Sequence, residues 1–358
     1  MTERRPGDST RTAHAGLPAG ADGEPFLPGP TFAAPYHLAG PADASRFNYG
    51  RYDNPTWARL EDALGELEGG HSVVFAAGMA AVSAVVIPGL HTGDVLVAPS
   101  DAYPGIRAIA RDVLEPNGVE VRLVPSSDEA FRGALQGATL VWLESPSNPG
   151  LHVLDLPALI AEAHAGGAVV AVDNTLAGPL RQRPLELGAD YSVMSASKHL
   201  AGHSDLIMGA VAVSDGARAV ALREWRIATG SIPGPFEAWL AHRSLATLGL
   251  RLERQEANAR ALADALGARD DVTGVRWPGV GSVVCFDVGS HARADAFLEA
   301  CELVAAATSF GGLHSNAERR ARWGSDDVGE GFIRFNCGIE DAPDLVADVE
   351  RALELSRP

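Results

Sequence analysis

Cysteine is scarce in this chain of 358 residues, and its scarcity limits the kinds of protein the chain can be. The three cysteines, Cys285, Cys301 and Cys337, lie late in the sequence and lack the spacing of metal ligands. An odd number of cysteines in an otherwise ordinary composition predicts reduced thiols in a cytoplasmic protein. No disulfide framework and no metal site are expected.

Positive charge is also in short supply. Lysine and arginine together number 29, against 46 acidic residues, which gives a formal net charge of −17. Nucleic-acid binding depends on clustered cations, and the sequence has no basic stripe, so we expect no nucleic-acid partner. The acidity is typical of a protein that is kept soluble by its charge.

Long uninterrupted hydrophobic runs are few. Residues 1–16 contain no apolar core of the kind that a signal peptide needs. The longest apolar stretch, residues 73–90, has nearly the length of a membrane helix, but Gly78, Ser83 and Pro88 interrupt it. We therefore expect a buried strand followed by a buried helix in this stretch, and no membrane association.

What the chain does contain is a lysine among small hydroxylated residues. Ser195 and Ser197 precede Lys198, directly after the β-like run 191–194. An amine with few charged neighbours can attack a carbonyl, and the two hydroxyls can bind phosphate oxygens of the same ligand. This combination indicates pyridoxal phosphate (PLP), with Lys198 joined to its aldehyde as a Schiff base.

A carboxylate and a glycine turn complete the expected cofactor site. Asp173 follows the apolar run 169–172, and parallel strands place such a residue at the ligand-binding edge of an α/β sheet. We expect Asp173 to pair with the protonated pyridine nitrogen of PLP. The strand–turn–helix pattern over residues 73–81 predicts a phosphate contact through the backbone N–H groups of Gly78 and Met79.

Strand-like and helical stretches alternate along most of the chain. Six β-like segments cover residues 95–98, 119–124, 140–143, 169–172, 191–194 and 206–213. Helical patterns such as residues 156–165 separate them, which predicts a mostly parallel sheet with helices on both faces. A long helical pattern begins near residue 225 and breaks at residues 230–235. We therefore divide the chain into an extended arm (1–48), a PLP-binding α/β domain (49–232) and a C-terminal α+β domain (233–358).

Longer motifs extend this pattern over nearly the whole chain. They are Thr10-Arg11 through His14-Ala15-Gly16, Tyr49-Gly50-Arg51-Tyr52-Asp53-Asn54-Pro55-Thr56, Glu144-Ser145-Pro146-Ser147-Asn148-Pro149, Gln182 through Asp190, and Ala307-Thr308-Ser309-Phe310-Gly311-Gly312. In this order they resemble the PLP-dependent trans-sulfuration enzymes, which include cystathionine γ-lyase, cystathionine γ-synthase and methionine γ-lyase. The resemblance implies the PLP-dependent transferase fold of the aspartate-aminotransferase type (type I), an α/β fold with a smaller α+β C-terminal domain.

The resemblance also implies roles for residues outside the lysine motif. Tyr49 and Arg51 would bind the cofactor phosphate of a partner subunit, which suits the planar fork of an arginine. Tyr103 would stack on the cofactor ring and assist proton transfer. Asn148 matches a residue near the cofactor phenolate oxygen and the substrate carboxylate.

The substrate end of the site and the oligomeric state follow from the same resemblance. Arg334 matches the arginine that holds the amino-acid carboxylate with two hydrogen bonds, and Ser309 lies at the same end of the site. The arm over residues 1–48 would wrap a neighbouring subunit. We therefore expect a homo-oligomer, a tetramer, in which each active site is shared between subunits.

Together these features predict a PLP-dependent carbon–sulfur lyase. The expected reaction is α,γ-elimination of cystathionine to cysteine, 2-oxobutanoate and ammonia. Methionine γ-lyase activity stays open, although Gly105 stands where methionine γ-lyases often have a cysteine. So does γ-replacement by a cystathionine γ-synthase or an O-acylhomoserine sulfhydrylase. From other classes, an aminotransferase would share Lys198 and Asp173 but not the Tyr-Gly-Arg stretch. A non-catalytic protein of the same fold would be expected to have lost one of Lys198, Asp173 and Arg334.

Three departures from the family pattern and one variable position bear on specificity. Pro104 follows Tyr103 where the family has glycine, and His314 replaces a family carboxylate. The segment near residues 279–283 is shorter than usual, and Thr308 lies at a position that varies between specificities. These departures leave open which sulfur amino acid is the substrate, and whether it belongs to primary or specialised metabolism.

Overall fold

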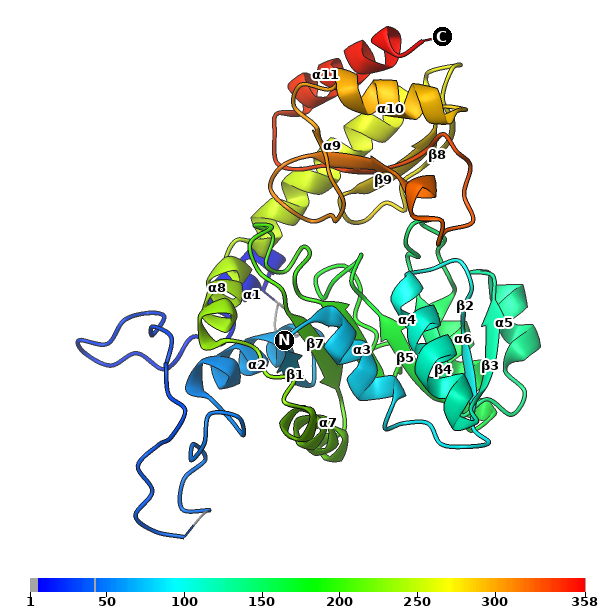
Figure 1. Ribbon diagram of the computed structural model, residues 1–358. Coiled ribbons are helices and arrows are strands. Elements are labelled where there is room, and N and C mark those ends of the chain that lie inside the picture. Colours follow the sequence, from blue (N-terminus) through cyan, green and yellow to red (C-terminus); the bar gives the residue numbers. More distant parts are fainter. Residues whose placement is uncertain (1–5, 42, 358) are drawn as a thin grey trace, which may run out of the picture.

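The computed structural model describes residues 6–41 and 43–357, and its larger sheet has seven strands (Figure 1). In spatial order these are β1 (His71–Phe75), β7 (Gly209–Val213), β6 (Tyr191–Ser195), β5 (Val169–Asp173), β4 (Leu140–Glu144), β2 (Val95–Pro99) and β3 (Glu120–Val124). Strand β7 is antiparallel to both of its neighbours, and the other pairs are parallel. The prediction of a mostly parallel sheet is confirmed.

Helices cover both faces of this sheet. Alternate residues of one strand pack into different clusters: Leu96 and Ala98 face one way, and Val95 and Val97 face the other. The first face is covered by α3 (Gly78–Val86), α4 (Pro104–Ile109) and α7 (Gly216–Thr229). The second is covered by α2 (Pro55–Glu68), α5 (Asp128–Ala134), α6 (Leu156–Ala165) and α8 (Pro235–Leu245). A short π-helix, η1 (Ala110–Leu114), and a 3₁₀ helix, η2 (Glu115–Asn117), follow α4.

Helix α2 shows how local sequence sets an element's limits. The Asn54 side chain accepts a hydrogen bond from the Thr56 N–H, and Pro55 occupies the first turn, where its missing N–H costs nothing. Gly69 ends the helix in the left-handed conformation, with φ of 80°. Local sequence signals at both ends therefore set the limits of α2.

The smaller sheet lies beyond the long helix α9 (Leu248–Gly267) and has five strands (Figure 1). In spatial order these are β10 (Ala305–Ala306), β11 (Asn316–Arg319), β12 (Phe332–Asn336), β9 (Val283–Asp287) and β8 (Thr273–Arg276). Only β10 and β11 pair in parallel. A 3₁₀ helix, η3 (Arg320–Trp323), follows β11. Helices α9, α10 (His291–Ala300) and α11 (Ala342–Leu355) pack on one face. The other face meets the larger unit, where Val283 and Cys285 pack with Leu151 and Leu176.

The N-terminal arm extends away from both sheets (Figure 1). Over residues 6–41 and 43–48 it is irregular apart from α1 (Asp8–His14), which contacts α9. Phe26 is 91% exposed and Phe32 is 72% exposed, which is unusual for residues of this size. The domain limits at residues 48 and 232, and the wrapping of the arm around a neighbour, stay predictions.

The cysteines and the helices carry two further observations. Cys285 and Cys337 are buried, Cys301 is half-buried, and all three are free thiols. Within residues 6–41 and 43–357, no helix combines the length and the apolar character needed to cross a membrane.

Candidate active site

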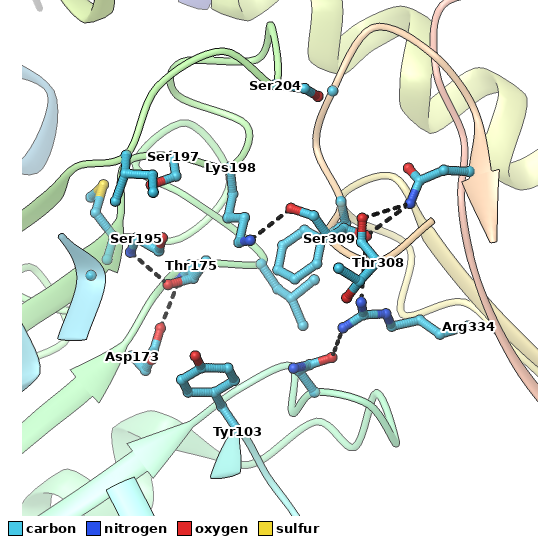
Figure 2. Close-up of a pocket in the computed structure, with 18 of the residues that line it drawn as sticks. Tyr103, Asp173, Thr175, Ser195, Ser197, Lys198, Ser204, Thr308, Ser309 and Arg334 are labelled. Atoms are coloured by element: carbon cyan, nitrogen blue, oxygen red, sulfur yellow. Dashed lines mark hydrogen bonds between the residues drawn. The ribbon is translucent and has the colours of Figure 1, made fainter. Parts of the chain in front are cut away.

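A cavity of about 700 Å³ lies between the carboxyl edge of the larger sheet and the smaller sheet (Figure 2). Ten of the residues expected from the sequence line it: Gly78, Met79, Tyr103, Asn148, Asp173, Ser195, Ser197, Lys198, Ser309 and Arg334. They come from both sheets and from positions up to the far end of the chain. The structure therefore brings together almost the whole predicted site.

Lys198 lies in the turn that follows β6. Its Nζ donates a hydrogen bond to Ser309 Oγ at 2.7 Å (Figure 2) and lies 5.3 Å from the centre of the Phe310 ring. Burial, and after it the nearby Arg334 cation, lower the pKa of the Lys198 amine, although Glu318 opposes them. Composition carried a further signal, because Lys198 is the only lysine in the sequence. The chain therefore has a single side-chain amine.

Two carboxyl groups lie side by side at the ends of adjacent strands. Asp173 ends β5 and Glu144 ends β4, and the two residues are paired in the strand register. Burial raises the pKa of both, and the charge of Asp173 raises the pKa of Glu144 further. In the part of the chain that the structure describes, neither forms an ion pair with lysine or arginine. Such a carboxyl pair suits a cationic ring nitrogen.

Glu144 was not predicted as a site residue, yet it holds two residues that were. Its Oε2 accepts a hydrogen bond from the Tyr103 N–H at 3.1 Å, and its Oε1 accepts one from the Asn148 N–H at 2.6 Å. Burial, then Asp173 and Glu144, raise the pKa of the Tyr103 phenol. Pro104, a departure from the family pattern, simply begins α4.

The other end of the cavity has the features of a phosphate site. Helix α3 begins at Gly78 with no side-chain cap, so its first N–H groups are available to an anion. A Cβ on Gly78 would lie 2.9 Å from Ser195 Cβ, so only glycine lets the helix approach the serine this closely. Thr175, also not predicted, accepts the Ser195 N–H at 2.9 Å and hydrogen-bonds Asp173 (Figure 2). Ser197 Oγ donates to the Met208 carbonyl at 3.2 Å.

Arg334 lies on β12 at the opposite side of the cavity. Its Nη1 donates to Asn148 Oδ1 at 2.6 Å (Figure 2). Its Nη2 forms an ion pair with Glu318. Glu318 is buried and also accepts hydrogen bonds from Arg320, Trp323 and Thr308. Sequence reasoning missed Glu318, because one carboxylate within the run Asn316–Arg319 has no recognisable pattern. Arg334 is not a solvated residue of an edge strand, since it is 5% exposed and β12 is an inner strand.

Two predicted residues lie elsewhere. Tyr49 and Arg51 do not line the cavity of their own chain. Arg51 Nη1 instead donates to the Ile227 carbonyl at 2.8 Å, and the guanidinium lies over the rings of Tyr49 and Tyr52. Their expected contact with a partner's cofactor stays a prediction. His314 does line the cavity, at an exposed position.

These features fit PLP: an anion cradle that a side chain on Gly78 would fill, a single amine, and a buried carboxyl pair without a counter-charge. The fold and the cavity thus define a PLP-dependent enzyme. The model of the family "Cys/Met metabolism PLP-dependent enzyme" matches residues 19–354, and the chain belongs to this family. The predictions of family, fold class and cofactor are confirmed, as is a PLP-dependent lyase of the trans-sulfuration group at the level of the family.

Individual relatives resemble the chain over its whole length. A protein of Streptomyces coelicolor named "Putative cystathionine gamma-lyase" is 52% identical, over 98% of this chain and 94% of its own. Among solved structures, a cystathionine γ-lyase of Micromonospora echinospora is 35% identical with a TM-score of 0.89, and covers 97% of this chain and 99% of its own. A cystathionine γ-synthase of Xanthomonas oryzae pv. oryzae, solved in complex with cystathionine, is 30% identical with a TM-score of 0.93, over 99% of both chains.

Proposed function

We propose that the protein cleaves cystathionine by α,γ-elimination, giving cysteine, 2-oxobutanoate and ammonia. The observation that carries this proposal is the arrangement of one amine and one guanidinium on opposite sides of the same cavity. Lys198 Nζ is joined to Ser309 Oγ, and Arg334 Nη2 lies 3.4 Å from the Ser309 carbonyl oxygen. The relatives named cystathionine γ-lyase support this choice of substrate.

The cofactor would be held from three directions. The N–H groups of Gly78 and Met79, with the hydroxyls of Ser195 and Ser197, would bind its phosphate. Asp173 would hold the ring nitrogen in its protonated form, and the Tyr103 side chain would cover one ring face. When bound, the cofactor supplies an electron sink that stabilises negative charge next to the amino-acid nitrogen.

Arg334 would bind the substrate carboxylate. A guanidinium offers a planar pair of donors that matches a carboxylate, and burial makes each charge-assisted hydrogen bond stronger than it would be in water. Asn148 fixes one edge of the guanidinium through its Oδ1. Together with Ser309, these residues would orient the Cα–H bond toward Lys198.

Proton transfer would be the work of Lys198 and Tyr103. Because burial lowers the pKa of the Lys198 amine, a larger fraction of it is free to accept a proton from Cα. Because burial raises the pKa of the Tyr103 phenol, this group keeps its proton at neutral pH and can donate it to the departing sulfur. The two side chains thus suit opposite roles.

We also propose a cytoplasmic homotetramer with active sites shared between subunits. The free thiols of all three cysteines support a reducing location. The arm, with its exposed Phe26 and Phe32, and the position of Arg51 outside its own cavity support a shared site. The division into an arm (1–48), a PLP-binding domain (49–232) and a C-terminal domain (233–358) is part of the same proposal.

A three-substrate assay tests the proposed reaction. The PLP-loaded protein would be mixed separately with L-cystathionine, with L-methionine, and with O-succinylhomoserine plus cysteine. We expect 2-oxobutanoate and cysteine from cystathionine, with little methanethiol from methionine. Cystathionine formed from the acylhomoserine would identify a synthase, methanethiol a methionine γ-lyase, and amino transfer to a 2-oxo acid without ammonia an aminotransferase.

A further inference from the structure

A chain of buried polar side chains joins the two sheets directly behind Lys198. His199 Nε2 lies 2.7 Å from Ser282 Oγ, and Ser282 Oγ donates to Asn336 Oδ1 at 2.7 Å. His199 is 4% exposed, Ser282 is fully buried, and Asn336 is 1% exposed. His199 follows the cofactor lysine, Ser282 precedes β9, and Asn336 ends β12. None of the three was assigned a role above.

The direction of each hydrogen bond in this chain is fixed. Asn336 Oδ1 also accepts the Gly311 N–H at 2.7 Å, and Asn336 Nδ2 donates to Asn316 Oδ1 at 2.9 Å, so the amide has one possible orientation. The Ser282 hydroxyl therefore donates its only proton to Asn336 Oδ1. Burial lowers the pKa of His199 to about 4, so the ring is neutral and carries one N–H. Because the Ser282 hydroxyl donates to Asn336, it can only accept from His199, which places this N–H on Nε2.

The same series of hydrogen bonds continues through Asn316 and holds the loop that carries Ser309. We call residues 307–311 the Ser309 loop. Asn316 Nδ2 donates to the carbonyl oxygens of Ala307, Thr308 and Ser309, at 2.9, 3.2 and 3.1 Å. Ser309 itself has φ of 83°, a left-handed conformation that is costly for a residue with a side chain and must be held by its surroundings.

The Ser309 loop rests directly on the backbone of the lysine turn. A Cβ built on Gly311 would lie 2.5 Å from the His199 backbone nitrogen and 2.9 Å from the Lys198 carbonyl carbon. The loop therefore contacts His199 through Gly311 and is tied to the His199 ring through Asn336 and Ser282. These contacts form a closed ring between the lysine turn and the smaller sheet.

Strand β12 carries both this ring and the proposed substrate clamp. Arg334 and Asn336 are two residues apart, so their side chains lie on the same face of the strand, while Ile333 and Phe335 pack in the core behind it. Arg334 reaches Asn148 of the larger unit, and Asn336 reaches His199 through Ser282. The strand is thus attached to the larger unit at both positions.

We propose that His199, Ser282 and Asn336 form a latch, a set of positioning residues that fixes the Ser309 hydroxyl against Lys198 Nζ and sets the distance between Lys198 and Arg334. The latch touches neither the substrate nor the reacting atoms, and acts through Ser309 and β12. It depends on the role of Lys198 in the proposed function, and not on which sulfur amino acid is the substrate.

The test is a protonation measurement at Lys198 in the full chain before PLP is added, where Nζ is a free amine as in the structure. Because the sequence has one lysine, protein grown on lysine labelled with nitrogen-15 at Nζ gives one Nζ signal, whose pH titration reports that atom alone. Arg334 lowers the pKa of Lys198 and Glu318 raises it, and both residues stay in place in the variants. Steady-state kcat and KM of the PLP-loaded protein, and the melting temperature, would be measured beside it.

Two substitutions break the latch in different ways. His199→Phe keeps an aromatic ring against Phe310, whose centre lies 5.7 Å away, but removes the donor. Ser282→Ala removes a single oxygen. In both we expect the Nζ titration midpoint to fall by about half a unit, because the protonated amine loses a well-placed acceptor, and kcat to fall about fivefold to tenfold. The double variant should show the same fall in the midpoint and in kcat as either single variant, since both substitutions interrupt the same series of hydrogen bonds.

Controls separate positioning from general stability. His199→Gln presents an N–H close to the position of Nε2 and should restore the wild-type midpoint. Asn258→Ala removes a buried amide that donates to the Gly338 and Glu340 carbonyls, apart from the latch; it should lower the melting temperature without moving the midpoint. An unchanged or raised midpoint in Ser282→Ala, or a loss of stability with no change in Nζ, would refute the latch.

Discussion

In the larger sheet the groups that face the cavity stand at strand ends, whereas in the smaller sheet they depend on side-chain hydrogen bonds. Asp173 and Glu144 end adjacent parallel strands, and Lys198 follows β6. Arg334, by contrast, is oriented by Asn148 and Glu318, and Ser309 by Asn316. The cofactor end is thus built by backbone topology and the proposed substrate end by side chains, so substitutions at the two ends should have separable effects.

The largest effect should come from removing the amine at the cofactor end. Lys198→Ala leaves no lysine in the chain, so we expect loss of the visible absorbance of lysine-bound cofactor and a fall in kcat of about 10⁴-fold. Absorbance spectra measure the loss of lysine-bound cofactor, and steady-state turnover measures the fall in kcat. A cofactor still covalently bound to a side chain in this variant would rule out the assignment.

At the substrate end we expect a smaller effect that spares the cofactor. Arg334→Lys keeps the charge but loses the planar pair of donors, and should raise KM about 10- to 100-fold with unchanged cofactor absorbance. Arg319→Lys is the matched control on β11, because Arg319 pairs with Asp295 and Glu330 outside the cavity. A loss of cofactor in Arg334→Lys, or an equal effect in the control, would break the division between the two ends.

Tyr103→Phe should have an intermediate effect confined to the departure of sulfur. The ring stays to cover the cofactor, but the proton donor is lost, so we expect kcat to fall about tenfold or more with little change in KM. Tyr191→Phe is the control, since the Tyr191 hydroxyl bonds Arg218 away from the cavity. Equal loss in both variants would mean that the Tyr103 hydroxyl has no part in the reaction.

The smallest effect concerns stability, and it has opposite pH dependence in the two units. Burial raises the pKa of Glu68, beneath the larger sheet, to about 8. The folded chain then keeps a proton that the unfolded chain releases above about pH 4.5, so stability falls as pH rises toward 8, by up to about 1.4 kcal/mol per pH unit. In the smaller unit, Arg269 lowers the pKa of Asp271, and that stability is lost as pH falls below about 4.

Melting temperatures across pH would show this contrast. Glu68→Gln cannot ionise, so its melting temperature relative to wild type should increase from pH 5 to pH 8. Glu66→Gln, at an exposed position of the same helix, should show no such trend. A flat difference for Glu68→Gln would show that Glu68 titrates like an ordinary surface carboxyl.

The contrast between the two sheets also explains how much could be predicted from the sequence. Lys198, Asp173 and Gly78 were found because strand-end chemistry leaves a local pattern in the sequence. Glu318, Ser282 and Asn336 were not found, because each acts through partners that only the fold brings near. Asn336 and Ser282 are 54 positions apart and share one hydrogen bond. Glu144 lies within one of the sequence motifs, but the hydrogen bonds that it accepts from the Tyr103 and Asn148 N–H groups could not be inferred from the sequence.

The single lysine has a consequence for how the protein tolerates its own cofactor. Free pyridoxal phosphate is an aldehyde, and in most proteins it also forms adducts with surface lysines. Here Lys198 is the one lysine, and the other strongly basic side chains are arginines, which do not form such adducts readily. Apart from the terminal amine, aldehyde chemistry has one target per chain, so an excess of cofactor can saturate the active site without marking the surface.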